Sequence, residues 1–207
     1  MAATAYNIDT QVLDDGGPVI LRLSPVINLT GDQFFEFCQI NRDLRIERTA
    51  EGEIEIMPPT GGTTSERNSE TGMQLRLWAK RDGTGAVFDS SGGFNLPNGA
   101  TRSPDAAWVL RSRLAALTSA QREKFIPLCP DFVIEIRSPS DSFTALQAKM
   151  QEYIDNGARL GWLIDPLQRR VYIYRPQSLP EILDNPAMLS GDPVLPGFTL
   201  DLSEIWQ

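Results

Sequence analysis

The sequence feature that most constrains the fold is an apolar segment, residues 131–138, that one acidic residue interrupts. Its centre reads Phe-Val-Ile-Glu-Ile, and β-branched and aromatic residues in a run of this length are typical of a buried strand. Ser140 or Asp141 then caps a predicted helix that runs to about Asn156 and stops at Gly157. A hairpin predicted at 160–164 and 170–174 follows. This order predicts an α/β (α+β) domain with a mixed central sheet flanked by helices.

The rest of the chain is consistent with one such domain. At 207 residues the chain is long enough for a single substantial core. We expect residues 1–29 to form an N-terminal arm packed on the core and residues 30–207 to form the domain. The elements expected from caps, periodicity and turn residues are a strand at 19–23, a helix at 30–41, hairpin strands at 44–49 and 53–57, a helix at 63–80, strands at 86–90 and 103–109, a short helix at 119–125, and a last strand and turn within 193–207.

Composition excludes several kinds of chemistry. The chain has no histidine, which excludes Ser-His-Asp and Cys-His mechanisms and histidine-ligated zinc. Cys38 and Cys129 are far apart among apolar neighbours, as buried free thiols are. No apolar run approaches the ~20 residues that span a bilayer, and the N-terminus lacks the features of a secretory signal, so a cytoplasmic location is expected. The net charge of −8 argues against nonspecific coating of DNA.

Two acidic residues, Asp105 and Glu135, each interrupt a predicted apolar strand. Alternation places Glu135 with Val133 on one face of its strand. A lone acid here is usually a structural carboxylate that other groups satisfy. Two acids on neighbouring strands favour a divalent-metal site, because burying a charge without a partner costs several kcal/mol. With oxygen ligands alone available, the expected ion is Mg²⁺ or Mn²⁺.

Lys149 is the third candidate. The predicted helix carries an apolar stripe that includes Leu146 and Tyr153, and Lys149 falls inside it. The lysine either extends its ammonium group from the edge of the stripe to solvent or directs it at the acids on the preceding strand, with Glu135 as the best partner. In the second case it would position a water or offset charge on a phosphate. Methionine at this position would be expected to preserve the fold.

These residues carry a resemblance to a known family. The segments that carry it are Ser103-Pro-Asp105, Pro130–Asp141 with its Glu-x-x-Ser-Pro-Ser string, Lys149–Tyr153 and Gly161–Pro166. They resemble the bacterial Uma-type family of restriction-endonuclease-like proteins, within the PD-(D/E)XK nuclease superfamily, over about residues 30–206.

The resemblance implies a metal-dependent endonuclease that hydrolyses phosphodiester bonds of DNA. Asp105 and Glu135 match the two acids, and with the main-chain carbonyl of Ile136 they would hold Mg²⁺ or Mn²⁺. Lys149 matches a helix lysine of the family, whereas the superfamily's strand-lysine position holds Arg137. The superfamily's helix glutamate has three candidates in this chain: Glu66, Glu70 and, more weakly, Glu47.

Two alternatives stay open at this stage. The missing strand lysine and the acidic charge favour a catalytically inactive nuclease-like module that acts through nucleic-acid binding or assembly. The second concerns residues 58–65, Pro-Pro-Thr-Gly-Gly-Thr-Thr-Ser, which precede a predicted helix. This segment could hold a phosphate at the helix N-terminus, but a plain turn is the favoured interpretation because a Walker lysine is missing. By analogy with related nucleases, a homodimer is expected, and no membrane partner is.

Overall fold

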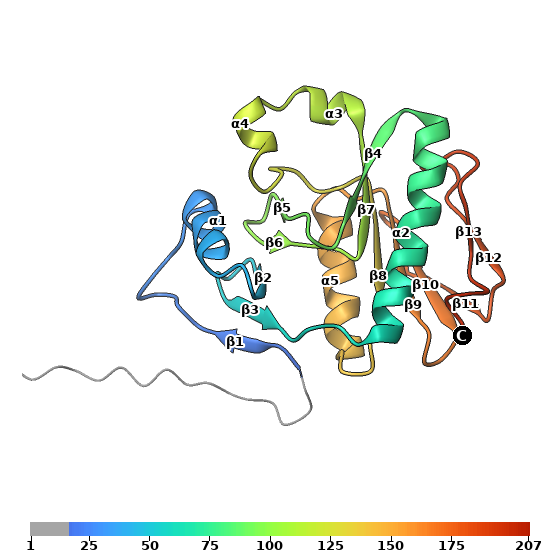
Figure 1. The fold of residues 1–207 in the computed structure, drawn as a ribbon, viewed down its shortest axis with the longest axis horizontal. Helices are drawn as coiled ribbons and strands as arrows, with labels where there is room; N and C mark the ends of the chain where they lie inside the picture. The colour runs from blue at the N-terminus through green and yellow to red at the C-terminus, as the bar shows by residue number, and fades with distance from the viewer. Residues whose placement is uncertain (1–16) are drawn as a thin grey trace, which may run out of the picture.

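A six-stranded mixed sheet forms the centre of the protein in the computed structural model, which describes residues 17–207 (Figure 1). The strand order is β11-β10-β9-β8-β7-β4. Only β8 and β9 are parallel, because α5 connects them as a crossover, and the other pairs are antiparallel. The strands are β4 (Gly85–Asp89), β7 (Ala106–Leu110), β8 (Phe132–Ile136), β9 (Leu160–Asp165), β10 (Arg170–Tyr174) and β11 (Glu181–Asp184). The expected mixed sheet flanked by helices is confirmed.

Each face of this sheet is covered by a different layer. Helix α2 (Gly62–Asp82) and the hairpin β12 (Met188–Ser190) and β13 (Thr199–Asp201) cover one face, and helix α5 (Phe143–Asp155) covers the other (Figure 1). Phe132, Ile134 and Ile136 of β8 face the α2 layer, whereas Val133 faces α5. The predicted alternation therefore holds, and it leaves Glu135 on the α5 side of the sheet.

A second sheet builds the N-terminal part of the described chain. Its order is β1-β3-β2-β6-β5, with β1 (Val19–Leu21), β2 (Arg45–Arg48), β3 (Ile54–Met57), β5 (Phe94–Asn95) and β6 (Thr101–Arg102). Helix α1 (Gly31–Ile40) packs on it through Phe34, which joins Ile46 and Ile54 in a small separate core. Of the expected N-terminal arm, residues 1–16 lie outside the described residues, and β1 pairs with β3.

Several local predictions are confirmed, but helix α5 is capped by Ser142 instead of the expected Ser140 or Asp141. Thr30 and Gln33 form the expected capping box of α1, and both predicted hairpins are present. The predicted helix at 119–125 is shorter, α4 (Ser119–Arg122), and follows an unpredicted helix, α3 (Arg111–Ala115). Strands β11 and β12 were also not predicted. Among the described residues, no helix is both long and apolar enough to cross a membrane.

Helix α2 begins one residue before its predicted start, at Gly62. Its N-cap is Gly61, which offers no side-chain hydrogen bond. Met73 and Leu77 lie on an exposed face, and these side chains are 48% and 52% exposed. Leu75 and Trp78 are packed on the sheet. The helix carries apolar residues on two faces, so periodicity alone does not identify the buried one.

Candidate active site

A cleft of about 670 Å³ opens where the two sheets meet. One wall is the β2–β3 hairpin and the loop that leads from it into α2, and the other is the end of β8 with the first turns of α5. Six carboxylates and three cations line it: Glu47, Glu55, Asp105, Glu135, Asp141, Glu152, Arg45, Arg102 and Lys149. Asp105, Glu135 and Lys149, which the sequence singled out, therefore share one cavity.

Lys149 bridges two buried glutamates. Its Nζ lies 2.9 Å from Oε1 of Glu135 and 3.0 Å from Oε1 of Glu47, and its side chain is only 16% exposed. The hydroxyl of Tyr153, one turn along α5, donates to the same Glu135 oxygen at 3.0 Å. The contact expected between Lys149 and Glu135 is present, so the ammonium does not extend to bulk solvent.

Asp105 lies within the predicted strand at 103–109, but the observed strand β7 begins one residue after it, at Ala106. Its Oδ2 accepts a hydrogen bond of 2.8 Å from the main-chain N–H of Ile136, the residue after Glu135. Its Oδ1 accepts one of 2.9 Å from the Asn68 amide on α2, and a guanidinium nitrogen of Arg45 lies 3.6 Å away. These contacts fix Asp105 against the strand that carries Glu135.

Burial shifts the pKa values of these acids. It raises the pKa of Glu135 to about 7, against the opposing effect of Lys149 and together with the nearby charges of Asp105 and Glu47. It also raises the pKa of Asp105, although the Ile136 N–H and Arg45 act in the opposite direction. Burial acts on Glu47 too, but the charges of Lys149 and Arg102 lower its pKa below the ordinary value.

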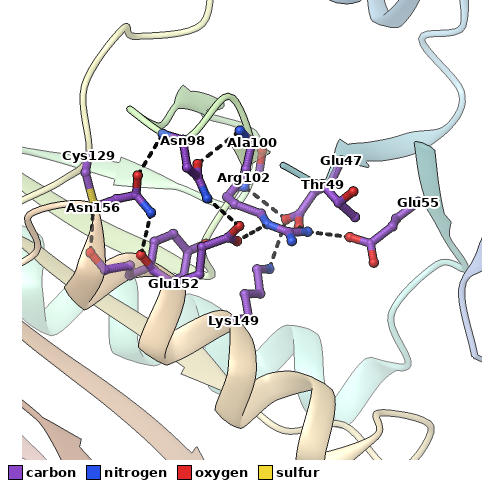
Figure 2. A network of polar contacts seen from close by, with 12 residues as sticks. Glu47, Thr49, Glu55, Asn98, Ala100, Arg102, Cys129, Lys149, Glu152 and Asn156 are labelled. Atoms are coloured by element: carbon purple, nitrogen blue, oxygen red, sulfur yellow. Dashed lines mark hydrogen bonds and ion pairs between the residues drawn. The ribbon is translucent and has the colours of Figure 1, made fainter. Parts of the chain in front are cut away.

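Arg102 holds the surroundings of Glu47 in place (Figure 2). Its guanidinium contacts Glu47 at 3.2 Å, forms an ion pair with Glu55, and contacts Glu152 of α5 at 2.7 Å. Figure 2 shows the guanidinium between these three carboxylates, with the Lys149 ammonium directed at Glu47 from below. The network ties the β2–β3 hairpin to α5, so both walls of the cleft are joined through one arginine.

Of the remaining predicted residues, one lies in the cleft and three lie outside it. Glu47, the weakest of the three glutamate candidates, lies in the cleft. Glu66 and Glu70 line a separate surface depression on α2. Arg137 is turned away: it donates to Oδ2 of the buried Asp165 at 2.9 Å. Arg137 holds the strand-lysine position of the superfamily, but it follows the last residue of β8, Ile136, so strand alternation does not direct it to the Glu135 face.

Four polar residues of the site were not singled out for it from the sequence. Tyr153 was placed in an apolar stripe, and Arg45 lies on a predicted hairpin strand that carries no motif. Asn68 and Arg102 carry no motif, and they reach the site only because α2 and β6 are packed against it. Arg102 lies on a short strand, and its contacts with Glu47 and Glu152 become evident only in the tertiary structure.

Metal binding by this site has to rest on a small set of donors. Across residues 17–207, no three Asp, Glu, His or Cys side chains are gathered closely enough to hold an ion. Lys149 takes the place between Glu135 and Glu47. Asp105, Glu135 and the Ile136 carbonyl remain as oxygen donors. Each carboxylate oxygen that accepts a hydrogen bond keeps a further lone pair. Burial raises the pKa of both Asp105 and Glu135, and a bound cation would favour their charged forms. This donor set fits a hard cation.

The mixed sheet flanked by helices is a restriction-endonuclease-like fold, and the carboxylates and Lys149 lie in the cleft beside this sheet. The chain belongs to the Uma2 family, described as "Putative restriction endonuclease", whose model matches residues 32–203. A crystal structure from Anabaena variabilis, described as "a putative nuclease belonging to DUF820", is similar with a TM-score of 0.68 and 23% identity, over 86% of this chain and 97% of that one. No curated protein matches the chain. The family resemblance predicted from the sequence is confirmed.

Proposed function

We propose that this protein is a metal-dependent endonuclease that hydrolyses phosphodiester bonds of DNA. The observation that carries the proposal is the position of the Lys149 ammonium, 2.9 Å from Glu135 in a cleft that Asp105 also lines. Two buried acids and a lysine at the meeting point of two strands and a helix are suited to phosphoryl chemistry. Membership of the Uma2 family supports the same reaction class.

Asp105, Glu135 and the main-chain carbonyl of Ile136 are the groups that would hold Mg²⁺ or Mn²⁺. When bound, such an ion supplies a Lewis acid and lowers the pKa of a coordinated water. Lys149 would orient the attacking water and offset negative charge on the phosphate. Glu47 keeps the lysine charged and directed at Glu135, which is a positioning role in this mechanism.

A second candidate is an inactive nuclease-like module that binds nucleic acid or assembles with other proteins. One observation favours it: Lys149 is paired with two carboxylates, and the described residues contain no ready three-ligand cluster. We infer nuclease activity in preference, because Asp105, Glu135 and Lys149 line one cleft and the chain belongs to the Uma2 family. We also propose that the protein acts in the cytoplasm, where bacterial DNA is located. A homodimer would place two active sites on one duplex, so that both strands could be cut.

A cleavage assay tests this function. Supercoiled plasmid DNA, linear duplex, single-stranded DNA and RNA are incubated with the protein in Mg²⁺, Mn²⁺ or EDTA. We expect cleavage of DNA with either metal and none in EDTA. Asp105→Ala should abolish it, while Glu70→Gln, which changes an acid outside the cleft, should cleave like the wild type. Cleavage that survives Asp105→Ala, or no cleavage of any substrate by the wild type, would reject the proposal.

A further inference from the structure

The N-terminus of α2 opens into the cleft beside the candidate active site. Pro58–Thr64 line the cavity, and the helix begins at Gly62 with Gly61 as a cap that offers no side chain. The first intrahelical bond is donated by the N–H of Ser65 to the carbonyl of Gly61. The N–H groups of Gly62, Thr63 and Thr64 therefore have no acceptor among residues 17–207. Free N–H groups at the start of a long helix attract an anion.

Thr64 gives an independent indication of a ligand. Its side chain is 93% buried, with 7% of its surface exposed, and lines the same cleft. Within the described part of the chain, its hydroxyl has no hydrogen-bond partner. The hydroxyl is therefore a donor and acceptor without a partner among residues 17–207, on a residue that lines the cleft. The hydroxyl and the free N–H groups of the first helical turn together form a set of donors with no protein acceptor.

The side-chain cations of the cleft are already paired with carboxylates, so an anion would have to be bound by other groups. Carboxylates outnumber cations on its walls, and Lys149 and Arg102 are both paired with glutamates. Arg45 lies 3.6 Å from Asp105. Side-chain cations therefore offer little uncompensated positive charge to a polyanion. The helix N-terminus supplies it without a side chain, as partial charge on N–H groups.

The distance from the candidate active site suits a neighbouring phosphate. Asn68, whose amide donates to Asp105 at 2.9 Å, is four residues after Thr64 and on the same face of α2. Four residues advance a helix by about 6 Å. A ligand at the first turn would therefore lie one helical turn from the candidate metal-binding carboxylate, a spacing of the order of that between successive phosphates on one strand.

We propose that Gly61–Thr64 form a binding site for a backbone phosphate of the nucleic acid, next to the phosphate that is cleaved. The identity of the ligand rests on the proposed nuclease function, but the anion site itself does not. Gly61 has an extended backbone with φ of −66°, and a Cβ there would meet nothing within 4 Å. Glycine is therefore not needed for the local fold, whereas the missing side chain keeps the N–H groups free.

This predicts that Gly61→Asp will improve the helix cap and block the site. Aspartate is a favoured N-cap residue, so the fold should be kept, while its carboxylate takes the N–H groups and repels phosphate. We expect binding of a fluorescein-labelled DNA duplex, measured in EDTA, to weaken about tenfold. Thr64→Val, which removes only the hydroxyl, should also weaken it. Thr30→Asp, at the exposed cap of α1 outside the cleft, adds the same charge and should bind like the wild type.

Titration with inorganic phosphate at constant ionic strength, followed by ¹⁵N–¹H NMR, separates this site from the proposed function. The Gly62, Thr63 and Thr64 amide signals should shift in the wild type and in Thr30→Asp, but not in Gly61→Asp. Such shifts in a protein that cleaves no nucleic acid would support the anion site and reject the nuclease. Cleavage without such shifts, or a Gly61→Asp protein that binds DNA like the wild type, would overturn the anion site alone.

Discussion

Replacement of Lys149 by methionine tests how the buried charges are balanced. Methionine keeps the apolar stem but removes the ammonium that neutralises Glu135 and Glu47. Glu47 retains Arg102 at 3.2 Å, and among residues 17–207 Glu135 retains the hydroxyl of Tyr153 as its one side-chain hydrogen-bond partner. The sequence alone suggested that methionine would be tolerated. The two ion pairs predict a loss of stability instead, because removing one partner of a buried pair destabilises a protein by about 3–5 kcal/mol.

The size of the effect should depend on pH. The pKa of Glu135 in the folded protein, about 7, exceeds its ordinary value of 4.5, so this group's contribution to stability is lost as pH rises toward 7. Lys149 lowers this pKa, and its removal raises it further. The variant therefore loses extra stability only above pH about 7. At pH 8.5 the additional loss is up to about 2 kcal/mol, at about 1.4 kcal/mol per pH unit.

Urea unfolding at pH 5.5 and 8.5 provides the measurement. We expect Lys149→Met to lose about 2 kcal/mol at pH 5.5, where only the charged contact with Glu47 is missing, and about 4 kcal/mol at pH 8.5. Lys124→Met is the matched control, because Lys124 pairs with Asp32 on the surface at 2.9 Å with 40% and 77% of the side chains exposed. It should change stability by less than about 1 kcal/mol at both values. Equal losses for Lys149→Met at both pH values, or a loss no larger than the control's, would refute this reasoning.

Three further predictions concern packing, thiols and metal binding. Gly85→Ala should destabilise the protein by about 1–3 kcal/mol, because the added Cβ would lie 2.1 Å from the ring of Trp108 on β7. Gly72→Ala on α2 places its Cβ in open space and should stabilise the protein by up to about 1 kcal/mol. Calorimetry that finds Gly85→Ala more stable than Gly72→Ala would contradict this prediction. Burial raises the pKa of Cys38 to about 11 and of Cys129 to about 12, so Cys→Ser at either position should leave cleavage unchanged, and loss of cleavage in a folded variant would show a functional thiol. Because Glu135 must lose its proton to bind a cation, Mg²⁺ should bind more tightly at pH 8 than at pH 6 in calorimetric titrations, and equal affinities would exclude it as a ligand.

The sequence identified those site residues whose chemistry conflicts with their surroundings. Glu135 and Asp105 stood out against apolar neighbours, and Lys149 stood out inside a helical stripe. Each of these conflicts is local, so it can be recognised without a structure. The contact between Lys149 and Glu135 also followed, since β8 leads directly into α5.

The remaining site residues depend on packing between distant segments. Glu47 lies on a short hairpin with several charged residues, and nothing in the sequence pattern distinguishes it from the other charged residues of the hairpin. It enters the cleft because the second sheet packs against α5 through Arg102. Glu66 and Glu70 were candidates because the resemblance implies a glutamate on this helix, but α2 packs on the sheet through Leu75 and Trp78, and both glutamates lie outside the cleft. Periodicity defines a stripe, and only the tertiary structure decides which stripe is buried.

The claim that Asp105 and Glu135 hold a catalytic metal can be tested most directly by crystallography. An anomalous-difference map from crystals soaked in Mn²⁺ would locate the ion without any assumption about substrate. We predict a peak bound by Asp105, Glu135 and the carbonyl of Ile136, which disappears in Asp105→Asn crystals. A peak located instead among Glu47, Glu55 and Glu152, or no peak in the cleft at saturating Mn²⁺, would contradict the proposed centre.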